Sequence, residues 1–149
     1  MLMIKSYLIN NVKNEYIPDN ALFNEWLSSI EHSEDAEITI KIVTPNEMKN
    51  LNILYRDKDK ISDTLAFSFD NLLIDKKIIL GDIAMCANKI NLDSIAFKKE
   101  KSDRWAHLLI HSTLHLLGYT HDNKIDQEYM ENKEIDILKK FNIFNPYEI

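Results

Sequence analysis

Residues 111–121 have the sequence HSTLHLLGYTH, and we expect the fold to be organised around them. Residues four apart lie on one face of a helix, so His111 and His115 can direct their imidazoles at a common ion. Gly118 can end this helix in a left-handed conformation, which lets the chain turn back and bring His121 to the same ion. The stretch therefore predicts a metal site with three histidine ligands and an open position.

The spacing H-x-x-x-H-x-x-G-x-x-H resembles that of the metzincin zinc peptidases, in which a glycine turn also delivers a third histidine. Those enzymes carry a glutamate as general base directly after the first histidine, and Ser112 occupies that position here. This difference argues against peptide hydrolysis by that route. A zinc-like ion with an open position could still lower the pKa of a bound water to about 7 and polarise a phosphoryl oxygen.

The residue types of His107 and Arg56 suggest roles for both at this site. His107 lies one turn before His111 and is a ligand, a hydrogen-bond partner of a ligand or a packed residue. We favour the last two roles, because a fourth histidine ligand would close the open position. Arg56 offers a planar fork of donors that matches phosphate oxygens, although a charged run such as residues 56–60 is usually a solvated loop.

The composition is that of one globular domain spanning residues 1–149. Hydrophobic and charged fractions of 45% and 28% are ordinary, and no apolar run approaches the roughly 20 residues of a membrane span. The formal net charge of -6 argues against coating nucleic acid by bulk electrostatics, which leaves a local basic patch as the alternative. Cys86 is the only cysteine, so we expect a cytoplasmic protein with no disulfide partner. The lack of a long apolar run predicts that it has no membrane partner either.

Apolar periodicity and capping signals predict alternating strands and helices early in the chain and mostly helices later. In chain order, the expected elements are a strand at 1–9, a helix after Pro18-Asp19, a strand at 38–42, a helix from a capping box at 44–47 to about Tyr55, a loop at 56–60, strands at 64–69 and 77–87, a helix from Asn88 to about Phe97, the histidine helix from Ser102, and a last helix at about 125–141.

Two of these strands should pair with each other. Strands 64–69 and 77–87 are expected to be antiparallel across a turn at residues 70–76, with Gly81 marking a bulge or a close backbone approach. The histidine helix is apolar over much of its circumference, so it should be central and buried. Together the elements predict an α+β fold of the α/β sandwich type, in which a small mixed sheet packs against helices.

Four motifs occur in an order that resembles the YbeY endoribonuclease family: residues 51–59 (LNILYRDKD), 63–67 (DTLAF), 80–83 (LGDI) and 111–121. The resemblance spans about residues 40–140, and the order of the motifs is far more specific than any one of them. It implies a metal-dependent hydrolase that acts on RNA, helps to mature the 3′ end of the small-subunit ribosomal RNA and takes part in ribosome quality control.

By position, the resemblance implies that His111, His115 and His121 are the metal ligands and that Arg56 faces the substrate. The chain also departs from the family pattern, which usually has glycine at Ser112, aspartate at Thr120, proline-threonine at Ile61-Ser62 and proline at Asp70. None of these departures removes a ligand. The loss of glycine could narrow the approach to the metal, and the loss of the aspartate removes a residue that could orient the third histidine.

We therefore expect a single-strand-specific endoribonuclease in which a metal-bound water acts on RNA and Arg56 holds the scissile phosphate. The ion is expected to be one Zn²⁺, although three imidazoles also accept Ni²⁺ or another divalent ion. The expected partners are an rRNA precursor and the small ribosomal subunit. Two alternatives stay open: a ribosome assembly factor whose metal is mainly structural, and a metallohydrolase of a non-RNA substrate.

Overall fold

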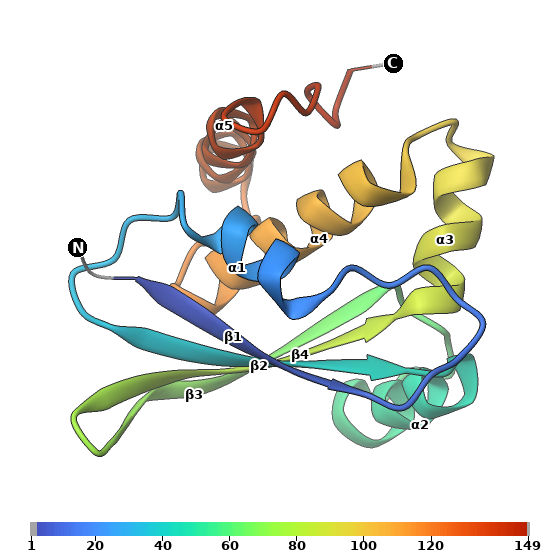
Figure 1. Cartoon of the computed structure of the whole chain (residues 1–149), viewed down its shortest axis with the longest axis horizontal. Coiled ribbons are helices and arrows are strands. Elements are labelled where there is room, and N and C mark those ends of the chain that lie inside the picture. The colour runs from blue at the N-terminus through green and yellow to red at the C-terminus, as the bar shows by residue number, and fades with distance from the viewer. Residues whose placement is uncertain (1–2, 149) are drawn as a thin grey trace.

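A four-stranded mixed sheet lies at the centre of the computed structural model, which describes residues 3–148 (Figure 1). Its strands are β1 (Ile4–Asn10), β2 (Ala36–Val43), β3 (Thr64–Ile74) and β4 (Lys77–Cys86), in the spatial order β1-β2-β4-β3. β1 and β4 both pair parallel with β2, whereas β3 pairs antiparallel with β4. Met1 and Leu2, with which the predicted first strand begins, lie outside the described residues.

Helices cover both faces of this sheet. Within the described residues they are α1 (Asn20–Leu27), α2 (Pro45–Arg56), α3 (Ala87–Ala96), α4 (Lys101–Leu116) and α5 (Lys124–Lys139). α1 and α4 lie over one face, α5 packs on α4, and α2 lies on the opposite face (Figure 1). The arrangement confirms the predicted α+β fold with a central histidine helix. Among residues 3–148, no helix has both the length and the apolar composition that crossing a membrane requires.

The alternation along β2 sorts side chains between two clusters. Ile38 and Ile40 have no exposed surface and join the main core, which includes the fully buried Trp105 of α4. Val43 belongs instead to a smaller cluster with Met48 of α2. The isoleucines, which point to one face of the sheet, pack in the core that includes α4. Val43 points to the opposite face, where α2 packs.

Capping chemistry sets some helix starts and not others. The predicted capping box at residues 44–47 is present, with reciprocal hydrogen bonds of 3.0 and 3.2 Å. The predicted starts of α3 and α4 were wrong by two residues, since their N-caps are Cys86 and Glu100 rather than Asn88 and Ser102. Neither N-cap side chain makes a capping hydrogen bond, so side-chain capping does not mark where these two helices begin.

The hairpin of β3 and β4 is longer than predicted. β3 continues to Ile74, and only Asp75 and Lys76 form the turn. Both have positive φ, 50° and 67°, as the type I′ turn of a two-residue hairpin requires. The predicted turn at residues 70–76 was therefore wrong in its first part. Asp70, with φ 52°, lies instead at a register shift inside the strand.

Gly81 confirms the predicted bulge and close backbone approach. The register of β4 shifts beside it against both neighbouring strands. Its φ is +153°, and a Cβ at this position would lie 2.0 Å from the carbonyl oxygen of Phe67. The absence of a side chain thus allows β3 to approach β4 at Phe67.

We expect Gly81→Ala to lower the free energy of unfolding by about 2–4 kcal/mol, because β3 must move away to admit the methyl group. Urea denaturation followed by circular dichroism measures the change. Gly118→Ala is the matched control, since Gly118 has φ +101° but a Cβ there would meet nothing within 4 Å. It should cost only the backbone strain, about 1–2 kcal/mol. Equal losses in the two variants would contradict the steric explanation.

Candidate functional site

One face of α4 carries three histidines at one-turn spacing. His107, His111 and His115 recur every four residues, so their side chains lie one above the other. The other faces of the helix are buried, and Trp105 and Leu109 have no exposed surface. The apolar faces fix α4 on the sheet, and the histidines line a hollow that β3 also borders.

The predicted glycine turn ends this helix. Gly118 has φ +101°, and its amide N–H donates to the carbonyl of His115 at 3.0 Å. The N–H of Tyr119 donates to the carbonyl of Leu114, also at 3.0 Å. These two bonds close the last helical turn and reverse the chain. The reversal brings the ring of His121 within 5.7 Å of His111 and 4.8 Å of His115, measured between centroids.

The structure brings the three predicted ligands together. One nitrogen from each of His111, His115 and His121 lies within 4.8 Å of the others, a group that can hold a metal ion. In the closest pair, Nε2 of His111 lies 3.1 Å from Nε2 of His115. Zn–N bonds of about 2.0–2.1 Å in a tetrahedral site place two ligand nitrogens about 3.3 Å apart. The pair therefore already has nearly the spacing of two zinc ligands.

The hydrogen bonding of His115 also fits a ligand. Its Nδ1 lies 3.1 Å from the carbonyl oxygen of Tyr119, which can only accept, so Nδ1 carries the hydrogen and Nε2 has a free lone pair. Burial lowers the pKa of His115, and the neighbouring His111 and His121 lower it further. Both effects favour the neutral imidazole that metal binding requires.

A second group shares His111. His107, His111 and Glu134 also present atoms within 4.8 Å of one another that can hold a metal ion. Glu134 has no exposed surface. Its Oε1 accepts from Nε2 of His107 and from the hydroxyl of Tyr147, both at 2.7 Å, and its Oε2 accepts from Nδ1 of His111 at 3.1 Å.

These bonds determine the charge of the buried carboxyl group. Burial alone would raise the pKa of Glu134, but the hydrogen bonds from His107, His111 and Tyr147 outweigh it and lower the pKa to about 2. Burial and the Glu134 carboxylate raise the pKa of Tyr147, so its hydroxyl remains a donor. The Glu134 carboxylate is thus ionised, and both of its oxygens are already bonded to protein donors.

The interpretation of the sequence did not assign Glu134 or Tyr147 to the site. A signal for Glu134 was present, because it lies between the buried Met130 and Ile137 on the apolar side of α5, where a carboxylate needs a partner. No comparable signal marks Tyr147. His107 is buried and bonded to Glu134 rather than to one of the three predicted ligands, and its role as a ligand's partner or a packed residue stays a prediction.

Arg56 borders the same hollow as the three histidines. It is the last residue of α2, and the hollow has a volume of about 790 Å³. Its guanidinium donates to the carbonyl of Ala66 at 2.8 Å and lies over the ring of Phe67, 4.9 Å from the centroid. These two contacts with β3 hold the guanidinium at the wall of the hollow.

The loop between α2 and β3 supplies further basic groups. Lys58 and Lys60 line the hollow. The buried amide of Asn52 ties the loop to α2, because it donates to the carbonyl of Lys60 and to the hydroxyl of Ser62, both at 3.0 Å. An ion pair of 3.0 Å between Arg104 and Asp63 ties the loop to α4. A locally basic wall is therefore held beside the histidines despite the acidic net charge.

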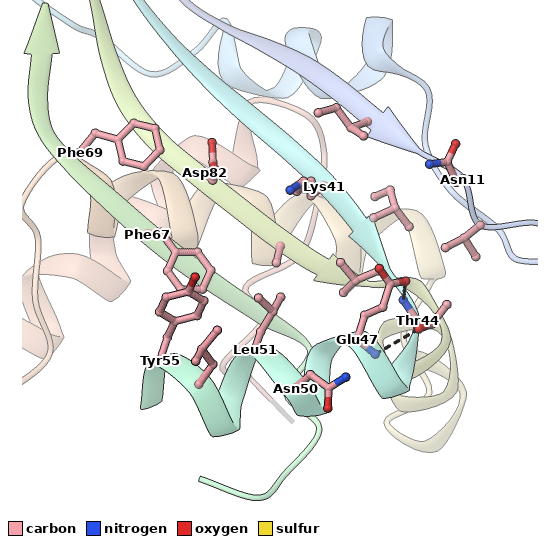
Figure 2. Close-up of a pocket in the computed structure, with 16 residues that line it drawn as sticks. Asn11, Lys41, Thr44, Glu47, Asn50, Leu51, Tyr55, Phe67, Phe69 and Asp82 are labelled. Atoms are coloured by element: carbon pink, nitrogen blue, oxygen red, sulfur yellow. Dashed lines mark hydrogen bonds between the residues drawn. The ribbon is translucent and has the colours of Figure 1, made fainter. Parts of the chain in front are cut away.

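A second hollow, bounded by α2 and the other face of the sheet, has different chemistry (Figure 2). Its volume is about 640 Å³, and apolar or aromatic side chains such as Leu51, Tyr55 and Phe67 line it, with the charged Lys41 and Asp82 on the strands. Among the described residues that border it, none is a histidine. All four histidines of the two groups that can bind a metal ion border the first hollow.

Comparison with known proteins points to one family. The chain matches the family described as Endoribonuclease YbeY over residues 9–142. Two proteins named Endoribonuclease YbeY from Buchnera aphidicola are similar to it. The one from subsp. Schizaphis graminum is 39% identical over 139 residues, 92% of this chain and 87% of the relative. The one from subsp. Cinara cedri is 42% identical over 144 residues, 93% and 92% respectively.

A more distant similarity concerns the fold. A Thermotoga maritima protein with a structure determined in solution has a TM-score of 0.59 and 20% identity, covering 99% of this chain and 100% of that chain. The two proteins therefore share a fold. Because the family match and the Buchnera relatives cover most of the sequence, the chain belongs to the YbeY endoribonuclease family.

Proposed function

We propose that this chain is a metal-dependent endoribonuclease whose site comprises His111, His115, His121 and Arg56. The observation that carries the proposal is the meeting of three imidazoles and a guanidinium around one hollow. Relatives named endoribonucleases match most of the chain, which supports RNA as the substrate. We treat residues 1–149 as one catalytic domain, because the main core joins side chains from β1 through α5.

His111, His115 and His121 would hold the ion, which we propose to be Zn²⁺, with Ni²⁺ or another divalent ion as alternatives. When bound there, such an ion would lower the pKa of a water molecule to about 7 and polarise a phosphoryl oxygen. Ser112 is only 2% exposed and carries no carboxylate, so the position after the first histidine supplies no general base for peptide hydrolysis.

Arg56 would bind the scissile phosphate. Two of its N–H groups donate to the carbonyls of Tyr55 and Ala66, at 3.2 and 2.8 Å, and its other N–H groups stay available for phosphate oxygens. Because these bonds hold the guanidinium in place, little ordering is needed when the substrate arrives. Lys58 and Lys60 would neutralise the flanking phosphates.

We further propose that the substrate is a single-stranded rRNA precursor, cut during 3′-end maturation of the small-subunit RNA and in quality control of the small ribosomal subunit. The order of motifs at residues 51–59, 63–67, 80–83 and 111–121 supports this assignment. A hollow of about 790 Å³ also suits a flexible single strand better than a stiff A-form duplex.

We expect the purified, metal-replete protein to cleave single-stranded RNA and to cleave a duplex of the same sequence more slowly. A chelator should abolish cleavage, and added Zn²⁺ should restore it, because His111, His115 and His121 lose their ion. Gel analysis of end-labelled RNA measures the reaction. His111→Ala, prepared in the same way, is the control for a contaminating nuclease.

Three results would contradict this proposal in different ways. Cleavage that persists in His111→Ala would assign the activity to a contaminant. A folded His111→Ala variant that supports ribosome maturation would favour the assembly factor with a structural metal. A metal-loaded protein that cleaves no RNA would favour a non-RNA substrate.

A further inference from the structure

We propose that Glu134 is a positioning residue that holds His111 in the tautomer able to bind the metal ion. This inference rests on the proposed metal site. Glu134 projects from α5 and has no exposed surface, and its carboxylate lies between His107 and His111. It borders a smaller hollow of about 280 Å³ beside His111 and His121, and both of its oxygens are already bonded to protein donors, so its contribution would act through the histidine that it contacts.

The contact with Glu134 determines which nitrogen of His111 carries the hydrogen. Nδ1 of His111 lies 3.1 Å from Oε2 of Glu134. A carboxylate can only accept, so Nδ1 must donate, and Nε2 is left with its lone pair. This Nε2 is the atom that lies 3.1 Å from Nε2 of His115. Glu134 therefore directs the His111 lone pair into the group of three histidines.

The other tautomer of His111 would close the site. With the hydrogen on Nε2, His111 would donate to Nε2 of His115, whose Nδ1 is already bonded to the carbonyl of Tyr119. The two ligands would then satisfy each other, and an incoming ion would have to break that bond and shift the hydrogen. By favouring the hydrogen on Nδ1, the carboxylate of Glu134 removes this competition.

Two neighbours keep the carboxylate in this position. Nε2 of His107 and the hydroxyl of Tyr147 each donate to Oε1 of Glu134 at 2.7 Å. Nδ1 of His107 is buried and has no hydrogen-bond partner among the described residues. A buried N–H group without a partner would cost about 1–3 kcal/mol, so the hydrogen of His107 is on Nε2, directed at Glu134. The other oxygen, Oε2, is thereby kept for His111.

Glu134→Gln tests the proposal with little change in shape. The amide nitrogen of the glutamine can donate to Nδ1 of His111 and so favour the tautomer with the hydrogen on Nε2. We expect the affinity of the full chain for Zn²⁺, measured by competition with a chromophoric chelator, to fall about 10–100-fold. Asp136→Asn makes the same change at an exposed position of α5 and should bind Zn²⁺ like the wild type.

A second measurement reads the tautomer itself. Long-range ¹H–¹⁵N NMR of the metal-free wild type should place the hydrogen of His111 on Nδ1, and Glu134→Gln should shift it towards Nε2. A merely structural role for Glu134 would lower the unfolding temperature without moving this signal. The wild-type spectrum tests the proposal even where the variant does not fold.

Wild-type Zn²⁺ affinity in folded Glu134→Gln, or a hydrogen on Nε2 of His111 in the wild type, would overturn the proposal. A wild-type protein that binds no Zn²⁺ would refute the proposed metal site and this inference with it. That failure is distinguishable, because it appears without any substitution.

Discussion

Replacing His115 with alanine is expected to remove the bound metal ion and to reduce RNA cleavage to background. His115 is central to the group, since its Nε2 lies 3.1 Å from that of His111 and its ring lies 4.8 Å from that of His121. Without it, two imidazoles are left, which is fewer protein ligands than catalytic zinc sites use. Metal content should fall from about one ion per chain to background.

Elemental analysis of the dialysed wild type and His115→Ala measures this loss, and circular dichroism checks the fold. His115 is partly exposed, so alanine leaves no sealed cavity and the variant should remain folded. His32→Ala is the matched control, because His32 lies outside both groups of metal-binding side chains. Equal metal content in all three proteins would refute the site. Metal loss with full cleavage would refute metal dependence alone.

Features that depend on near neighbours in the sequence could be predicted. The spacing of His111 and His115 follows from the helical repeat, and the reversal that delivers His121 follows from the conformation open to Gly118. The capping box at residues 44–47 is equally local. The approximate place of α4 and the shape of its histidine face therefore follow from the order of residues along the chain.

Features that depend on packing between distant segments could not be predicted in this way. Glu134 meets His111 only because α5 packs on α4; its place on the apolar side of α5 indicates that it needs a partner, but not which residue that partner is. Arg56 was a candidate by residue type, but only the family resemblance assigned it to the substrate. The match over residues 9–142 confirms that resemblance, and α2 and β3 together carry Arg56 to the hollow.

Arg56→Ala is expected to slow RNA cleavage by about 10²–10³-fold and to leave the metal content unchanged, because the guanidinium would stabilise charge that develops on the phosphate. The loss should fall mainly on kcat. Arg56 is exposed, so the free energy of unfolding should change by about 0.5 kcal/mol or less. Arg56→Lys should give an intermediate rate, because lysine keeps the charge but lacks the planar fork.

Single-turnover cleavage with saturating enzyme measures this effect separately from RNA binding. Lys49→Ala is the matched control, since Lys49 is an exposed cation on the same helix that pairs with Asp59 at 3.4 Å and does not line the hollow. It should cleave like the wild type. Undiminished cleavage by Arg56→Ala would show that other groups hold the phosphate, with Lys58 and Lys60 as the next candidates on that wall. The histidine site would stand in that case, because Arg56 comes from a different element and its guanidinium is held by Tyr55, Ala66 and Phe67 rather than by the histidines.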